Sequence, residues 1–208
     1  MSIYNYTLLC LGDSYTIGES VEEKERFPEQ AVTMLQAKGL SFAKPEIIAK
    51  TGWTTDELQA AIKEKNLTGT YDFVTLLIGV NNQYRGRDLQ NYRTEFAALL
   101  QTALQYSNGR TERVVVISIP DWGVTPFVSK DAKQRSAGTI AHEIDAFNAV
   151  NHGEANKAGV HYLEITYHSR LAATDSTLIA NDGLHPSGKM YANWAFKLAE
   201  YIAGTLQP

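Results

Sequence analysis

The sequence contains only one cysteine, Cys10, among its 208 residues. A single cysteine excludes an internal disulfide, so other interactions must hold the fold together. Cys10 stands inside the apolar run of residues 7–11, which lacks the polar, partly exposed surroundings that a catalytic thiol needs. We therefore expect Cys10 to be a small side chain of the core.

Long hydrophobic runs are missing as well. No apolar stretch approaches the length of about 18 residues that a membrane-spanning helix needs, so we expect no membrane span. A signal peptide consists of a basic region, an apolar stretch and a cleavage site, and this combination does not precede the first expected strand. The chain as given is therefore expected to be cytoplasmic, or to be the trimmed form of a secreted protein.

Positive charge is scarce, with 19 Lys and Arg residues against 23 Asp and Glu residues. The formal net charge of -4 argues against the phosphate backbone of a nucleic acid as the main partner. Patterns of metal ligands are missing too, because His142, His152, His161 and His168 have no partner at a convincing spacing. We expect these histidines on the surface or in loops, and we expect neither a metal nor a cofactor.

What the sequence does contain is a regular alternation of short apolar runs and longer amphipathic segments. Hydrophobic residues make up 44% of the chain and charged residues 20%, which suits one domain over residues 1–208. Strands are expected at residues 7–11, 45–49, 73–78, 114–119 and 160–165. Helices are expected at residues 27–38, 54–65, 92–106, 139–157 and 187–203, and loops at 19–26, 120–135 and 167–184.

Two local signals mark where helices begin. Thr54 and Glu57 have the spacing of a capping box, and Pro186 fits the first turn of the last helix. Strands that alternate with helices over short linkers predict right-handed crossovers and a parallel sheet. We therefore expect a three-layer α/β/α sandwich with a flavodoxin-like, five-stranded parallel sheet in the order 2-1-3-4-5.

Polar or glycine residues directly follow the ends of several expected strands. Gly12 cuts off the first apolar run and allows a tight turn, which leaves Ser14 exposed at the carboxyl end of the strand. The carboxyl ends of parallel strands lie along one edge of a sheet, so residues far apart in the sequence can meet there. The residues expected at this edge are Ser14, Gly52, Asn81, Asp182 and His185.

These residue types suit attack on an acyl carbon. The Ser14 hydroxyl is a poor nucleophile without a base, and His185 can be that base. Asp182, three residues before His185, is close enough to bond the other ring nitrogen and fix the tautomer. The backbone N–H groups of Ser14 and Gly52 and the side-chain amide of Asn81 are placed to stabilise the oxyanion that forms.

Four short blocks of this sequence resemble those of the GDSL, or SGNH, hydrolases, in their order and spacing. The blocks are Gly12-Asp13-Ser14, Gly52, Gly79-Val80-Asn81-Asn82 and Asp182-Gly183-Leu184-His185. The resemblance implies a serine esterase that works through an acyl-enzyme, with Ser14 as nucleophile and first oxyanion donor. It implies that Gly52 and Asn81 complete the oxyanion hole and that Asp182 and His185 supply the orienting carboxylate and the base. The family acts on lysophospholipids, short acyl esters, thioesters and acetylated sugars, so a small-molecule ester is the expected partner.

Two positions depart from the family pattern. Tyr15 stands where the family name has leucine, at a position that varies readily. Asn82 stands where the third block usually ends in aspartate. An amide can donate a hydrogen bond where a carboxylate only accepts, so the hydrogen bonds around Asn82 must differ while activity should survive.

Aromatic residues that follow strand ends are candidates for the walls of a substrate pocket. They are Trp53, Tyr84, Trp122 and Phe127, and the alternative for each is a purely packing role. The segment 120–135 is expected to shape the acyl or alcohol site. Because no apolar lid is evident, we expect short acyl chains and small or sugar-like alcohols to be preferred.

Plainer interpretations of the site residues remain open. Asp13 or Ser14 can cap the next helix, Asn81 can be a turn former, and His185 can stand at a helix start. The stretch from Ser14 to Gly18 is faintly similar to a hydroxyl-rich loop that binds the phosphate of FMN, which favours a flavin-binding module as an alternative function. A catalytically idle binding protein is a further alternative, and the sequence does not indicate the oligomeric state.

Overall fold

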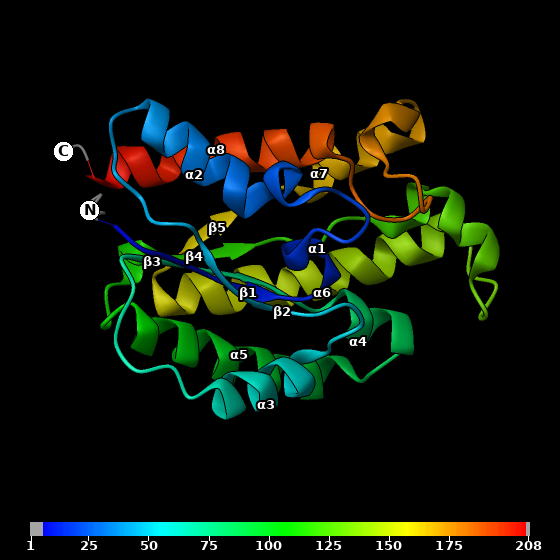
Figure 1. Ribbon diagram of the computed structural model, residues 1–208. Coiled ribbons are helices and arrows are strands. Elements are labelled where there is room, and N and C mark those ends of the chain that lie inside the picture. Colours follow the sequence, from blue (N-terminus) through cyan, green and yellow to red (C-terminus); the bar gives the residue numbers. More distant parts are fainter. Residues whose placement is uncertain (1–5, 207–208) are drawn as a thin grey trace.

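Five parallel strands form the middle layer of the computed structural model, which describes residues 6–206 (Figure 1). The strands are β1 (Leu8–Gly12), β2 (Glu46–Ala49), β3 (Phe73–Leu77), β4 (Val114–Ile117) and β5 (His161–Leu163). Their order across the sheet is β2-β1-β3-β4-β5, and every neighbouring pair runs parallel. This arrangement confirms the predicted flavodoxin-like sheet.

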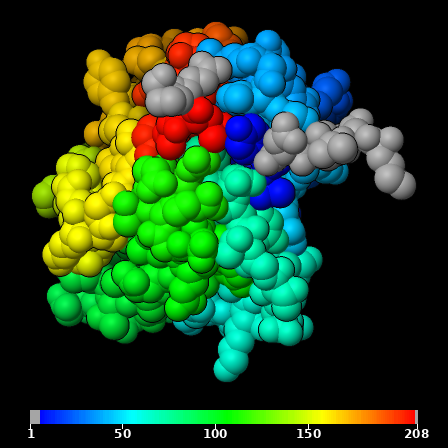
Figure 2. Space-filling model, turned by 90° about the vertical axis from the view of Figure 1, so that its left-hand side faces the viewer, coloured from blue at the N-terminus to red at the C-terminus, as the bar shows by residue number. Residues whose placement is uncertain are grey.

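Long helices cover both faces of the sheet (Figure 1). One face carries α2 (Phe27–Ala37) and α8 (Gly188–Leu206), which pack against each other. The other face carries α3 (Thr55–Lys65), α5 (Leu89–Tyr106) and α6 (Ala137–Ala158). Figure 2 views the end at which β1 begins, where the last turns of α8 lie beside the segment that leads from α5 to β4. Within residues 6–206, no helix has the length and apolarity to cross a bilayer.

The three inner strands of the sheet, β1, β3 and β4, are buried along their whole length. β1 lies between β2 and β3, and the side chains of Leu9, Cys10 and Leu11 have no exposed surface. Burial raises the pKa of the Cys10 thiol to about 12, so the thiol stays protonated at neutral pH. Cys10 is therefore a small core side chain, as predicted from the apolar run.

Two apolar runs leave the sheet two residues earlier than predicted. Ile119 lies beyond the end of β4, where its N–H donates to Oδ1 of Asn148 at 2.7 Å and its carbonyl accepts from Nδ2 of Asn148 at 3.0 Å. Ile165 lies beyond the end of β5, where its N–H donates to the hydroxyl of Ser118 at 2.8 Å. Polar side chains have replaced the strand ladder at both positions, a change that hydrophobicity does not reveal.

Short helices occupy places that the sequence pattern left irregular. The helices α1 (Ser14–Ile17) and α4 (Val80–Arg85) begin directly after β1 and β3. The predicted loop 167–184 holds most of α7 (Thr166–Ser169) and two 3-10 helices, Arg170–Ala173 and Ser176–Leu178. Three more 3-10 helices are Glu23–Glu25, Trp122–Val124 and Pro126–Lys130, and a last one, Thr111–Arg113, precedes β4.

One of the two predicted helix starts is confirmed and the other is wrong. Thr54 and Glu57 form the capping box at the start of α3. Pro186 does not lie in the first turn of α8, which begins at Gly188. Pro186 instead forms an isolated antiparallel bridge with Ile179, and this pairing holds the segment that contains His185 against the preceding 3-10 helix.

Candidate active site

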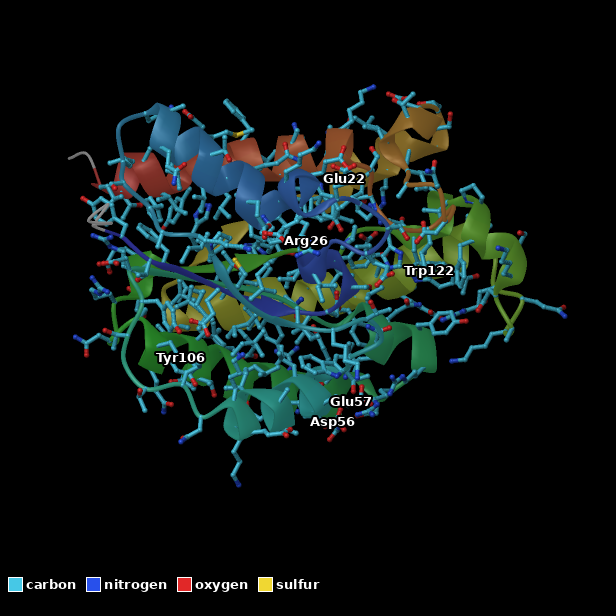
Figure 3. All side chains as sticks on the ribbon, viewed as in Figure 1. Glu22, Arg26, Asp56, Glu57, Tyr106 and Trp122 are labelled. Atoms are coloured by element: carbon cyan, nitrogen blue, oxygen red, sulfur yellow. The ribbon has the colours of Figure 1, made fainter. Side chains whose placement is uncertain are left out.

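A pocket of about 160 Å³ lies beyond the carboxyl ends of the strands. Residues from five separate parts of the sequence meet there, as the parallel sheet allows. The predicted site residues that line it are Ser14, Gly52, Asn81, His185, Tyr84, Trp122 and Phe127. Figure 3 shows Trp122 at this end of the molecule and Tyr106 at the opposite end of the sheet.

Ser14 is the first residue of α1, at the turn that ends β1. The Asp13 carboxylate caps this helix by accepting a hydrogen bond from the Tyr15 N–H at 3.0 Å. Gly12 is required by space, because a Cβ there would lie 2.5 Å from the carbonyl oxygen of Leu77. Among the described residues, the Ser14 hydroxyl has no hydrogen-bond partner, so it is free for a molecule in the pocket.

His185 and Asp182 form a close pair beside Ser14. Nδ1 of His185 lies 2.5 Å from Oδ2 of Asp182, and Oδ1 of Asp182 accepts from the N–H groups of Leu184 and His185 at 2.9 and 3.0 Å. Partial burial raises the pKa of Asp182, but these hydrogen bonds outweigh it and lower the pKa to about 2. An ionised Asp182 must accept the proton on Nδ1, so a neutral His185 ring keeps Nε2 free to act as a base.

Tyr15, the residue after Ser14, supports the imidazole from one side. Its ring is buried and meets the ring of His185 edge to face, with 5.5 Å between centroids. Burial raises the pKa of the Tyr15 phenol, so Tyr15 stays neutral. The aromatic side chain therefore fixes the His185 ring by packing alone.

Gly52 and Asn81 line the pocket from the ends of β2 and β3. Gly52 has φ +89°, which favours glycine, whereas a Cβ there would meet no atom within 4 Å. The side-chain amide of Asn81 donates to the carbonyl of Trp53 at 2.9 Å, and this bond leaves its second N–H free. Arg85 donates to the carbonyl of Gly52 at 2.7 Å. Asn81 and Arg85 of α4 therefore both bind backbone carbonyls of the Gly52–Trp53 turn.

Trp53 lies elsewhere than predicted. Its ring does not line the pocket of Ser14 but a separate hollow on the outer edge of the sheet, together with Ile48 and Ala61. After the left-handed turn at Gly52, the Trp53 carbonyl accepts the hydrogen bond from Asn81, while the Trp53 ring lies away from the pocket.

Three aromatic rings form one wall of the pocket. The ring centroids of Tyr84 and Trp122 are 5.5 Å apart, those of Trp122 and Phe127 6.1 Å, and those of Tyr84 and Phe127 6.4 Å. Trp122 and Phe127 belong to the segment 120–135, which therefore does build part of the site. These contacts fix the orientation of a largely apolar surface next to Ser14.

Sequence reasoning missed two residues that hold this wall. Oε1 of Gln83 accepts from the indole N–H of Trp122 at 2.8 Å. The guanidinium of Arg135 lies 5.2 Å from the ring centroid of Trp122 and 5.5 Å from that of Tyr84. Arg135 is itself held by the buried carboxylate of Asp131 at 2.9 Å. Neither Gln83 nor Arg135 belongs to a recognisable motif, so no signal in the sequence singles them out.

The other four histidines do not line the pocket. The ring of His161 stacks on Tyr201 with 3.8 Å between centroids, and the ring of His152 packs on Tyr162. Among residues 6–206, no group of three or more His, Cys, Asp or Glu side chains is arranged to hold a metal ion.

The sheet order, the two helical layers and the pocket at the strand ends define an α/β/α protein of the flavodoxin-like type. The model of the GDSL-like Lipase/Acylhydrolase family matches residues 10–192. The chain belongs to this family. A search of curated protein sequences gave no significant match.

Solved structures confirm the fold. An acetylxylan esterase from Geobacillus stearothermophilus shares 18% identity with a TM-score of 0.71, covering 96% of this chain and 94% of that chain. A lipase/acylhydrolase from Enterococcus faecalis shares 17% identity with a TM-score of 0.71, covering 96% of both chains. The psychrotrophic esterase EstA from Pseudoalteromonas sp. shares 17% identity with a TM-score of 0.68, covering 98% of this chain and all of that chain.

Proposed function

We propose that the protein is a serine hydrolase that cleaves carboxylic esters through an acyl-enzyme. The observation that supports this most strongly is the convergence of Ser14 and His185 on one pocket, with Asp182 2.5 Å behind the ring. A nucleophile, a base and an orienting carboxylate in this arrangement have the roles of a catalytic triad. The family to which the chain belongs supports the same reaction class.

The reaction begins when Nε2 of His185 takes the proton of the Ser14 hydroxyl, while Oγ of Ser14 bonds to the acyl carbon. The backbone N–H groups of Ser14 and Gly52 and the side-chain amide of Asn81 stabilise the resulting oxyanion. Collapse of this intermediate breaks the bond to the alcohol oxygen, and His185 returns the proton to the departing alcohol. Water then attacks the acyl-enzyme by the same route, which releases the acid and restores Ser14.

Asp182 supports both halves of the reaction without transferring a proton itself. Its pKa of about 2 keeps the carboxylate ionised throughout the neutral range. The carboxylate holds the proton on Nδ1 of His185, turns Nε2 toward the pocket and stabilises the imidazolium that forms in each step.

The substrate we propose has a short acyl chain and a compact or sugar-like alcohol. The pocket volume of about 160 Å³ is below the range of about 300–1,000 Å³ that is usual for drug-sized ligands. Tyr84, Trp122 and Phe127 bound the pocket on one side, which limits the apolar surface that additional methylene groups can bury inside it. One of the similar structures is an acetylxylan esterase, which fits a small acyl group on a sugar.

Turnover of simple esters tests this function. The wild-type protein should hydrolyse p-nitrophenyl acetate, and the Ser14→Ala variant should not, although both should unfold at the same temperature. Equal turnover by the variant would contradict the proposal. A folded wild-type protein without activity on any ester from acetate to palmitate would indicate an idle binding protein, and a yellow protein that releases FMN would indicate the flavin-binding alternative.

A further inference from the structure

Two successive asparagines of α4 bind the segment that follows Gly52. Asn81 donates to the Trp53 carbonyl at 2.9 Å. Asn82 makes two hydrogen bonds with Thr55: its Oδ1 accepts from the Thr55 N–H at 3.1 Å, and its Nδ2 donates to the Thr55 hydroxyl oxygen at 2.7 Å. These three bonds join α4, which carries Asn81, to the segment between Gly52 and the start of α3.

The hydrogen bonds around Thr55 have a fixed direction. The Thr55 hydroxyl has a single proton, which it donates to Oε2 of Glu95 on α5. Its oxygen can therefore only accept from residue 82, and the amide of Asn82 supplies the necessary N–H. Asn82 and Thr55 are both completely buried, so water does not offer a substitute partner.

We propose that Asn82, Thr55 and Glu95 form a one-way hydrogen-bond relay that positions the two oxyanion donors Gly52 and Asn81. The proposal rests on the ester hydrolysis proposed above. The relay runs from the Asn82 amide through the Thr55 hydroxyl to the Glu95 carboxylate. Asn82 is thus a positioning residue: it holds the segment whose Trp53 carbonyl orients the neighbouring Asn81 amide.

The burial of Asn82 and Thr55 explains why the relay can fix this geometry. Two ion pairs also join residues at and just after the end of α4 to the start of α3: Arg85 with Glu57 at 3.3 Å and Arg87 with Asp56 at 2.7 Å. Figure 3 shows both acidic residues at the start of α3. Their side chains are substantially exposed to water, so such pairs contribute little. Oxyanion donors must be placed within fractions of an ångström, which buried hydrogen bonds achieve better than exposed charges.

A carboxylate at position 82 would conflict with the fixed direction of the relay, because it cannot donate to the Thr55 hydroxyl. In the Asn82→Asp variant, the new carboxylate and Glu95 compete for the single proton of Thr55, so the carboxylate oxygen that faces Thr55 at the buried position 82 is left without a donor whenever Glu95 keeps that proton. Adding Glu95→Gln reverses the relay: the new amide at position 95 can donate to Thr55, and Thr55 can donate to the new carboxylate at position 82. In this variant Oε1 of residue 95 can still accept from the Asn91 side chain, which lies at 2.7 Å in the wild-type protein.

The decisive experiment measures kcat and KM for p-nitrophenyl acetate in the wild-type protein, N82D, E95Q and N82D/E95Q, per active site titrated with a fluorophosphonate. N82D should lower kcat by at least about tenfold, with KM changed by less than about twofold, because the donors act on the transition state. N82D/E95Q should recover kcat to within about threefold of E95Q alone, and its Tm should rise above that of N82D. Wild-type kcat in N82D, or a double variant as impaired as N82D, would overturn the proposal.

If N82D does not fold, a second pair of variants tests the role of the Thr55 hydroxyl in the relay. Thr55→Ser keeps the hydroxyl and should retain kcat within about twofold, whereas Thr55→Val removes it and should lower kcat about tenfold. Equal kcat in the two variants would overturn the relay. A wild-type protein without turnover would contradict the ester hydrolysis instead, and the recovery of Tm in N82D/E95Q would still report on the relay.

Discussion

The hydroxyl of Ser20 donates a hydrogen bond of 2.8 Å to Oδ2 of Asp182, the same oxygen that faces Nδ1 of His185. Ser20 adopts φ +67°, a conformation that costs a residue other than glycine roughly 1–2 kcal/mol. The preceding residue, Glu19, accepts a hydrogen bond from Thr51, next to Gly52. The turn after α1 therefore connects the Ser14 segment with both the Asp182 block and the glycine turn.

Removing the Ser20 hydroxyl should weaken catalysis. We expect Ser20→Ala to lower kcat about fivefold, which corresponds to the roughly 1 kcal/mol of one hydrogen bond. Ser20→Gly is the matched control, because it removes the hydroxyl and relieves the backbone conformation. Both variants should show the same loss in kcat for p-nitrophenyl acetate; full activity in the glycine variant would mean that the hydroxyl does not support Asp182.

Loss of the Asn81 amide should reduce the rate of the chemical step. We expect Asn81→Ala to lower kcat by about 10²–10³, the usual effect of removing one oxyanion donor, with little change in KM. Steady-state kinetics on p-nitrophenyl acetate measure both constants. A rise in KM alone would show that Asn81 binds the substrate and does not stabilise the oxyanion.

Acyl chain length should reveal the size of the pocket. We expect kcat/KM for p-nitrophenyl esters to be highest at acetate or butyrate, because the pocket of about 160 Å³ is small and the rings of Tyr84, Trp122 and Phe127 bound it on one side. Trp122→Ala should shift the preference toward octanoate, since each buried CH₂ contributes about 0.8 kcal/mol. Trp53→Ala is the control, because that ring lines a different hollow. A wild-type maximum at octanoate or longer would refute the preference for short chains.

Asp13 should make stability depend on pH. Its burial raises the pKa of the carboxyl to about 7 in the folded protein, against 3.8 in the unfolded chain. Between these values the folded state holds a proton that the unfolded state has released, so stability falls as pH rises from about 4 to 7. Asp13→Asn should remove this dependence on pH. The free energy of unfolding of the variant, relative to that of the wild type, should therefore increase by at least about 1 kcal/mol between about pH 4 and 7. A difference that does not change with pH, in denaturant titrations, would contradict the assignment.

Much of the fold could be predicted because it depends on patterns of local sequence. The alternation of apolar strands and amphipathic helices predicts a parallel sheet, and the flavodoxin-like order favoured for it is confirmed. The Thr54–Glu57 capping box marks the start of α3. The ends of β4 and β5 were not predictable, because side chains of Asn148 and Ser118 intercept the backbone there. The helices α1 and α4, of four and six residues, are too short to show a helical period.

The candidate site likewise contains residues that local sequence indicates and residues that only long-range contacts reveal. Ser14 and Asn81 lie within a few residues of the ends of β1 and β3, where a parallel sheet brings residues together, whereas His185 was found through its spacing to Asp182. The partners of these residues were hidden, because Ser20 contacts Asp182 across 162 positions and Gln83 contacts Trp122 across 39. Nothing in the local sequence of a polar loop residue indicates a partner at such a distance.

Covalent labelling of Ser14 is the most direct test of a serine hydrolase. A fluorophosphonate should add one group to the wild-type protein, and mass spectrometry of the digested protein should locate it on the peptide that contains Ser14. Prior incubation with a short-chain ester should slow the labelling, and Ser14→Ala should remain unlabelled. A wild-type protein that stays unlabelled, or one that carries the group on another residue, would contradict the central claim.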